Sequence, residues 1–243
     1  MARRWLSTLL VALVVSESSS LEPKEARNEI RKLLGVGGIR WLVAALDHAL
    51  HGSYFFNHNH QDGLGAELWR SDLTIGGTYM VKDIQPGAGD GYPSSLCEYY
   101  GKIYFAADNG RDGIELWSSD GTEAGTALFL DINPGSASSF VQLMTACDGL
   151  LFFGASDGQH GFELWGSDGT LENTKMLKDV TPGSSDSQIS SLECKRSTAG
   201  ETVLFFTVGT ADEHEQWLSD GTPEGTRPVN RPIGESTRLK EEV

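Results

Sequence analysis

The chain of 243 residues contains 19 Lys+Arg against 34 Asp+Glu, which gives a formal net charge of −15. Nucleic-acid binding needs a basic surface, so the acidic charge excludes that class and also disfavours binding to anionic membrane surfaces. A hydrophobic content of 39% fits a folded globular protein, and 29 glycines indicate many tight turns.

Residues 1–20 are typical of a secretory signal peptide. Arg3 and Arg4 precede an apolar run from Trp5 to Val15, and a small polar stretch follows at residues 16–20. The run is too short to cross a bilayer, which takes about 20 apolar residues. We therefore expect a secreted, extracellular protein with no membrane span after signal removal; the alternative is a buried N-terminal helix.

Residues 21–40 are expected to form a short, charged helical lead-in. The segment Glu22–Leu34 has Pro23 in its first turn and is followed by Gly35, a pair that is typical of the start and end of a helix. At the other end of the chain, residues 233–243 are expected to be a disordered tail.

A fourfold internal repeat occupies residues 41–232. Four segments align without gaps as variants of ELWxSDGTxxGT, at residues 67–78, 115–126, 163–174 and 215–226. The tryptophans of this motif recur at intervals of 48, 48 and 52 residues, and an invariant turn aspartate follows each of them. These repeat anchors are Trp69, Trp117, Trp165, Trp217, Asp72, Asp120, Asp168 and Asp220.

Each repeat is predicted to contain four short strands. The units cover about 41–87, 94–135, 141–183 and 189–232, and the opening strand of the first unit falls near Leu42–Leu50. Asp-Gly between apolar runs favours a hairpin, because these residues tolerate the positive φ of tight turns. Pro-Gly then closes the first three units.

Both faces of these strands are apolar. In Glu115-Leu116-Trp117 the leucine and the tryptophan point to opposite faces, and adjacent aromatic pairs such as Phe152-Phe153 do the same. Such sheets must be covered on both sides, which sheets stacked around an axis achieve. We predict an all-β, propeller-like fold of about four blades with four short antiparallel strands each. The alternatives are an open β-repeat array and a half-ring completed by a second chain as a homodimer.

The motif ELWxSDGTxxGT, with the flanking elements that recur beside it, resembles the ELWxxDGT repeat family. Downstream lie VKDIQPG (81–87), FLDINPG (129–135) and LKDVTPG (177–183). The resemblance covers about residues 50–226 and implies an exported β-repeat protein with propeller-like folding. It implies no enzymatic activity and no particular ligand.

The acidic loops before the third strand of each unit are the candidate metal ligands. Asp108, Asn109 and Asp112 lie in one such loop, and Asp157 lies in the next. Short Asp/Asn/Gly loops can present the oxygen ligands that calcium takes. The competing interpretation, which we favour, is a solvated loop whose Asp and Asn side chains accept backbone N–H groups. We therefore expect no cofactor, with calcium as the alternative.

Other polar residues give weaker signals. Histidines crowd the first unit at His48, His51, His58 and His60, but no set of partner ligands accompanies them. Glu115 and its equivalents are expected to bond a neighbouring blade, rather than to line a channel as a ring of carboxylates. The three cysteines are expected to be buried thiols, although one disulfide bridge is the alternative; they are Cys97, Cys147 and Cys194.

These patterns predict a secreted or cell-surface, non-enzymatic repeat module. Loops on a rigid scaffold commonly bind ligands, so we expect a protein or glycan surface as the partner. The alternatives are a propeller-based hydrolase or lyase with a site assembled across blades, and a structural remnant of a longer repeat array.

Overall fold

The computed structural model describes residues 49–50, 52–59, 63–72, 76–196, 200–210 and 213–229. This part of the chain is all-β and propeller-like, with four antiparallel sheets of four strands each, which confirms the predicted fold class. No helix with the length and apolarity needed for a bilayer crossing occurs among these residues. The predicted signal peptide 1–20, helical lead-in 21–40 and tail 233–243 lie outside the described residues.

The strands of each sheet pair in chain order, so each sheet is a simple meander. The first sheet contains β1 (Ala49–Leu50), β2 (Ser53–Asn59), β3 (Ala66–Ser71) and β4 (Tyr79–Lys82). The second contains β5 (Ser94–Tyr99), β6 (Lys102–Asp108), β7 (Ile114–Ser119) and β8 (Ala127–Leu130). The third contains β9 (Gln142–Cys147), β10 (Leu150–Ser156), β11 (Phe162–Ser167) and β12 (Lys175–Lys178). The fourth contains β13 (Ile189–Arg196), β14 (Thr202–Gly209), β15 (His214–Ser219) and β16 (Arg227–Pro228).

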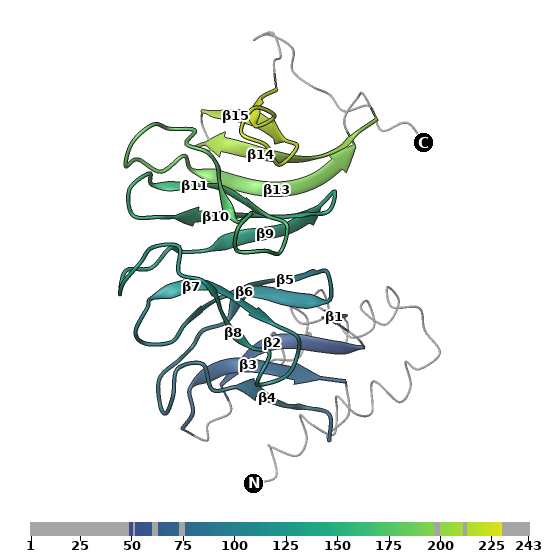
Figure 1. Cartoon of the computed structure of the whole chain (residues 1–243), viewed down its shortest axis with the longest axis vertical. Helices are drawn as coiled ribbons and strands as arrows, with labels where there is room; N and C mark the ends of the chain where they lie inside the picture. Colours follow the sequence, from purple (N-terminus) through teal and green to yellow (C-terminus); the bar gives the residue numbers. More distant parts are fainter. Residues whose placement is uncertain are drawn as a thin grey trace.

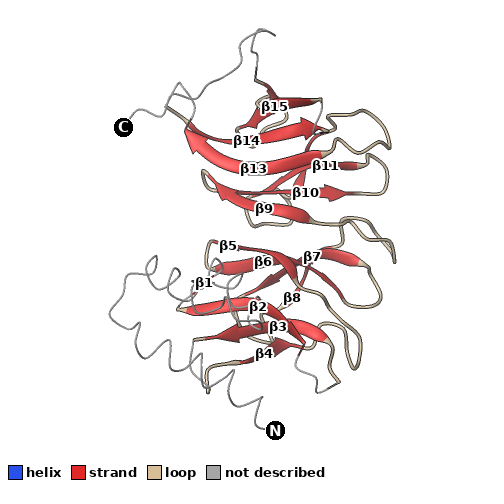
Figure 2. Ribbon diagram, turned by 180° about the vertical axis from the view of Figure 1, so that it is seen from behind, coloured by secondary structure: helices blue, strands red, loops and turns tan. Residues whose placement is uncertain are grey.

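The four sheets stack face to face in a column (Figures 1 and 2). In both views the first and fourth sheets lie at opposite ends of the stack. The described residues therefore form an open array of propeller-like sheets rather than a closed ring.

Apolar side chains fill the space between neighbouring sheets from both sides. Trp117 faces the first sheet and packs with Phe55, whereas its neighbour Leu116 faces the third sheet and packs with Trp165. This arrangement follows from the alternation of side chains along a strand. The same pattern recurs between the third and fourth sheets, where Phe152 and Leu164 contact the apolar side of β14. Each interior sheet is thus covered on both faces by its neighbours.

The SDGT segments form tight turns that are closed by their own side chains. In the second sheet, the hydroxyls of Ser119 and Thr126 lie 2.7 Å apart, and Asp120 Oδ1 accepts hydrogen bonds from the Thr122 N–H and hydroxyl at 2.9 and 2.7 Å. The turn glycine, Gly121, has φ +90°, and a Cβ there would lie 3.0 Å from the Phe55 ring of the first sheet. The turn therefore requires glycine for its backbone conformation and for its close approach to the preceding sheet.

The outward face of the fourth sheet departs from the repeat. Leu204 and Phe206 point toward the third sheet, so Thr207 and its cross-strand partner Gln216 point away from it. Gln216 Nε2 donates to Thr207 Oγ1 at 2.7 Å, and the Ser191 hydroxyl lies 3.1 Å from the same oxygen. We call these three residues, Ser191, Thr207 and Gln216, the polar cap. Gln216 occupies the place of the leucines that are buried between the interior sheets.

A disulfide bond joins the third and fourth sheets. Cys147 at the end of β9 pairs with Cys194 in β13, with a Cα–Cα distance of 5.3 Å. Cys97 is a free, half-buried thiol. The expectation of three buried thiols was therefore wrong for two of them, because β9 and β13 are adjacent in space and bring together cysteines 47 residues apart.

The polar cap gives a testable expectation about association. We expect the double variant Thr207→Ala with Gln216→Leu to self-associate. In the second sheet the equivalent cross-strand pair is Ala106 and Leu116, so the variant would make the outward face of the fourth sheet apolar like that of an interior sheet. Light scattering coupled to size exclusion would measure the mass over a concentration series. The matched control is Glu172→Leu, which adds a leucine to an exposed turn. A double variant with the mass and elution of the wild type would contradict the capping role.

Candidate functional site

The connections between sheets gather on one side of the stack. We call this surface the linker rim; it comprises the linkers 83–93, 131–141 and 179–188 and the loops 109–113 and 157–161. It lies on the side where β9 and β13 begin, at the left of Figure 1. Linkers and loops pack tightly: a Cβ on Gly113 would lie 2.8 Å from the Ala137 carbonyl oxygen, and one on Gly161 would lie 2.4 Å from that of Ser185.

Buried glutamates fix the linkers to the sheets. Glu115 Oε2 accepts a hydrogen bond from Ile132 N at 2.7 Å, and its Oε1 accepts one from Ser139 N at 2.9 Å. Glu67 binds the first linker in the same way, through Ile84 N and Gly91 N, both at 2.9 Å. In the third sheet the carboxylate accepts from a linker N–H and from a serine hydroxyl. We call Glu67, Glu115 and Glu163 the linker-binding glutamates.

Burial perturbs these carboxyl groups. All three side chains are fully buried, and this desolvation raises the pKa of Glu115 although the hydrogen bonds from Ser139 and Ile132 lower it. The pKa values of Glu67 and Glu163 are raised for the same reason. A perturbed carboxyl group in a cleft is a candidate acid or base. Here the perturbed groups repeat from sheet to sheet and lie behind the linkers, out of reach of a ligand on the rim.

A second contact fixes the far end of each linker. Asp90 Oδ1 accepts a hydrogen bond from Ala66 N at 2.7 Å, at the start of β3. Ser138 Oγ accepts from Ile114 N at 3.0 Å, and Asp186 Oδ1 accepts from Phe162 N at 2.8 Å. Each linker is thus attached at both ends to the sheet that precedes it, so the rim is a rigid surface.

Two aromatic side chains project from this rigid rim. Tyr92 is 59% exposed and Phe140 is 56% exposed, and they occupy equivalent positions in the first and second linkers. Both have left-handed backbone conformations, with φ 44° and 53°, and Gln188 at the third equivalent position has φ 48°. Bulky residues rarely adopt this conformation. Neither burial nor backbone preference therefore explains an aromatic residue at these two positions.

Tyr92 lies near the aspartate that anchors its linker. The Asp90 carboxylate raises the pKa of the Tyr92 hydroxyl. Asp90 also accepts a hydrogen bond from Ala66 N, at the start of β3. One carboxylate thus interacts both with the exposed tyrosine and with the sheet that precedes its linker.

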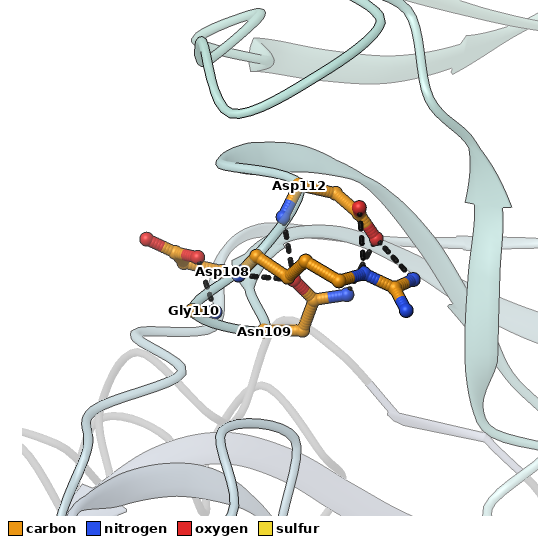
Figure 3. Close-up of polar contacts among 5 residues, drawn as sticks. Asp108, Asn109, Gly110 and Asp112 are labelled. Carbon is orange, nitrogen blue, oxygen red and sulfur yellow. Dashed lines mark hydrogen bonds and ion pairs between the residues drawn. The ribbon is translucent and has the colours of Figure 1, made fainter.

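Three of the predicted metal ligands lie at the end of β6 and in the loop 109–113, and they form hydrogen bonds within this segment (Figure 3). Asp108 Oδ1 accepts a hydrogen bond from Gly110 N at 2.6 Å, and Asn109 Oδ1 accepts from the backbone N–H groups of Arg111 and Asp112 at 2.9 Å. The Arg111 guanidinium donates to both carboxylate oxygens of Asp112, at 2.9 and 2.8 Å. Hydrogen bonds from Arg111 and Asn109 lower the pKa of Asp112 to about 2.

The fourth candidate ligand, Asp157, is paired with a histidine. Its Oδ1 accepts from Gln159 N and His160 N at 2.9 Å, and its Oδ2 lies 2.8 Å from His160 Nδ1. This hydrogen bond raises the pKa of His160. In both acidic loops the Asp and Asn oxygens therefore accept hydrogen bonds from backbone N–H groups and interact with one basic side chain, which is the arrangement of a structural loop.

No group of three or more His, Cys, Asp or Glu side chains is arranged to hold a metal ion within the described residues. The structure separates the candidate ligands of loops 109–113 and 157–161 onto different sheets. Of the histidines in the first unit, His48, His51 and His60 lie outside the described residues. His58 packs edge-on against Trp69, with ring centroids 5.2 Å apart.

The repeat anchors lie away from the rim residues. Trp117 and Trp165 are buried between sheets, and Trp217 donates from Nε1 to Glu215 at 2.9 Å. Asp120, Asp168 and Asp220 accept a hydrogen bond from the threonine N–H of their turns, and these turns lie at the opposite side of the stack from the linkers. Sequence reasoning missed Tyr92 and Phe140, although their 48-residue spacing matches the repeat and would have identified them as equivalent.

The linker-binding glutamates can be tested with a matched pair of variants. We expect Glu115→Gln to lower the free energy of unfolding by about 1–3 kcal/mol, because the amide nitrogen cannot accept the hydrogen bond of a buried linker N–H. Glu215, the equivalent residue of the fourth sheet, is exposed. Glu215→Gln should therefore change stability by less than about 0.5 kcal/mol in the same denaturant titration. Equal effects of the two variants would contradict the role assigned to the buried carboxylate.

Calcium dependence can be tested by thermal melting. We expect millimolar calcium to leave the melting temperature unchanged, because Asp112 and Asp157 are already hydrogen-bonded to Arg111 and His160. Magnesium at the same concentration controls for ionic strength. A rise with calcium alone would contradict this expectation.

Neither a protein-family model nor a curated protein matches the chain. Among solved structures, the chain is similar to the endo-arabinase from Bacteroides thetaiotaomicron VPI-5482, with 13% sequence identity and a TM-score of 0.35. The similarity covers 76% of this chain and 77% of that one.

Proposed function

We propose that this protein is a secreted or cell-surface, non-enzymatic binding module whose linker rim binds a protein or a glycan. The observation that carries the proposal is the pair of exposed aromatic residues, Tyr92 and Phe140, on linkers that buried glutamates hold in place. Loops attached to a rigid scaffold are well suited to binding, because little conformational freedom is lost when a ligand binds.

Two observations support a location outside the cytosol. Residues 1–20 contain a positively charged start, an apolar run and then a stretch of small residues, which is the order found in signal peptides. The Cys147–Cys194 bridge joins neighbouring sheets, and disulfides form and persist mainly in oxidising compartments. We also propose membership of the ELWxxDGT repeat family, because the four motif segments occupy the same third strand and following turn in each sheet.

A binding role is favoured over a hydrolase or lyase. A site assembled across sheets would require polar residues that differ from sheet to sheet and have perturbed pKa values. The carboxyl groups with raised pKa are instead the repeated, buried linker-binding glutamates Glu67, Glu115 and Glu163. Their oxygens are occupied by linker donors, so they serve the scaffold.

The proposal can be tested with the mature chain immobilised on a support. Extracellular material from the producing cells would be divided into a protease-treated glycan pool and a deglycosylated protein pool. We expect saturable retention from one pool, loss of retention with the rim variant Tyr92→Ala/Phe140→Ala, and an unchanged ligand mass after elution.

The matched control is Tyr100→Ala, because Tyr100 is 77% exposed but lies in the turn after β5, on the side opposite the linker rim. Retention from neither pool, or equal retention by the rim variant, would contradict a binding role of the rim. A ligand that is shortened or otherwise changed in mass would instead support the enzymatic alternative.

A further inference from the structure

We propose that the ligand of the linker rim is an uncharged glycan with a repeating structure, which runs along the stack and places one sugar ring on Tyr92 and another on Phe140. This inference rests on the proposed function and specifies its ligand. It is carried by the position, conformation and exposure of the two aromatic residues and by the charge of the surface around them.

Folding alone does not account for these two side chains. Their exposed fractions of 59% and 56% mean that neither contributes fully to a core. Their positive φ values favour glycine or asparagine, so both aromatic residues sit in a conformation that is unfavourable for them. Tyr100 combines a φ of 45° with 77% exposure, so conformation and exposure by themselves do not mark a ligand site; Tyr92 and Phe140 differ from it in lying at equivalent positions of two linkers. Gln188, at the equivalent position of the third linker, has the same left-handed conformation. The unfavourable backbone conformation therefore occurs in all three linkers, whereas an aromatic residue occurs only in the first two.

The arrangement of the rings matches a repeating ligand. Tyr92 and Phe140 precede β5 and β9, the equivalent strands of the second and third sheets. Packed sheets are about 10 Å apart, so equivalent residues of neighbouring sheets form a row with that spacing along the stack. A linear polysaccharide presents the C–H face of one ring after another, and such faces stack on aromatic rings as other apolar surfaces do.

The charges around the row select against an anionic ligand. The linkers 83–93, 131–141 and 179–188 contain five aspartates and no lysine, arginine or histidine. The two basic side chains of the neighbouring loops, Arg111 and His160, are already paired with Asp112 and Asp157. An acidic polysaccharide or phosphate would therefore meet net repulsion on the rim.

The linkers that carry the rings also carry polar side chains that suit sugar hydroxyls. The amides Gln85 and Asn133 occupy equivalent positions in the first and second linkers, and Asn133 Nδ2 donates to Ser138 O at 3.2 Å. Asp90 lies beside Tyr92 and can accept a hydrogen bond from a hydroxyl. Aromatic faces with neighbouring amides and carboxylates offer a neutral, hydroxyl-rich ligand both stacking and hydrogen bonds.

The test uses purified oligosaccharides and four variants of the full mature chain. The probes are the neutral hexasaccharides of β-1,4-linked glucose, xylose and mannose and of α-1,4-linked glucose, with hexagalacturonate as the anionic comparison. Binding would be measured by isothermal titration calorimetry. We expect at least one neutral probe to bind and hexagalacturonate to bind more weakly than that probe.

The variants separate binding from folding. Tyr92→Gly and Phe140→Gly remove a ring and also relieve the unfavourable φ, so we expect each to raise Kd about tenfold while the melting temperature stays the same or rises. Tyr100→Ala should leave Kd unchanged. Gln188→Tyr adds a third ring to the row and should lower Kd about threefold or more for a probe long enough to reach it.

Each result decides between this inference and the broader function. Failure of every neutral probe to bind, stronger binding of hexagalacturonate, or a Kd that is unchanged in both glycine variants would overturn the glycan inference. If the protein pool is retained through the rim while no neutral probe binds, the binding function stands and only the ligand class is wrong. If neither pool is retained, the proposed function itself fails.

Discussion

The hydrogen bonds between a buried glutamate and the linker that leaves its sheet hold this structure together. The stack needs each linker to turn sharply and deliver the next sheet face to face. A linker that crosses the edge of a sheet has backbone N–H groups that must find acceptors once water is excluded. Glu115 supplies two such acceptors at once, to Ile132 and Ser139. One side chain therefore both satisfies the linker and sets where the next sheet begins.

The same contact explains why the linker rim can present strained, exposed residues. Ser139, which donates to Glu115, directly precedes Phe140, and Gly91, which donates to Glu67, directly precedes Tyr92. The backbone directly before each aromatic position is therefore held by a buried carboxylate. A scaffold interaction inside the stack thus fixes the start of the segment that carries each exposed side chain.

Much of the fold could be predicted from the sequence, because its signals are local and repeated. The tryptophan interval and the Asp-Gly turns locate the strands, and apolar residues on both strand faces require neighbours on both sides. The hydrogen bonds from backbone N–H groups to the Asp and Asn side chains of the acidic loops could also be predicted, since Asx turns are local features. The Cys147–Cys194 bridge could not be predicted, because it depends on two first strands of different sheets lying side by side. The exposure of Tyr92 and Phe140 was equally inaccessible, since it depends on the path of the linkers in space.

The bridge between Cys147 and Cys194 has a consequence for local unfolding of the stack. In an array where each sheet contacts only its neighbours, a sheet with one neighbour is less stable than a sheet with two. Such a sheet is expected to unfold locally before the others. A locally unfolded sheet exposes an extended segment that proteases can cleave. The bridge covalently holds the fourth sheet to the third and, by closing a loop of about 47 residues, stabilises the native state by about 4 kcal/mol in the chain-entropy model. The bridge thus opposes separation and proteolysis of the fourth sheet, which contacts one other sheet rather than two among the described residues.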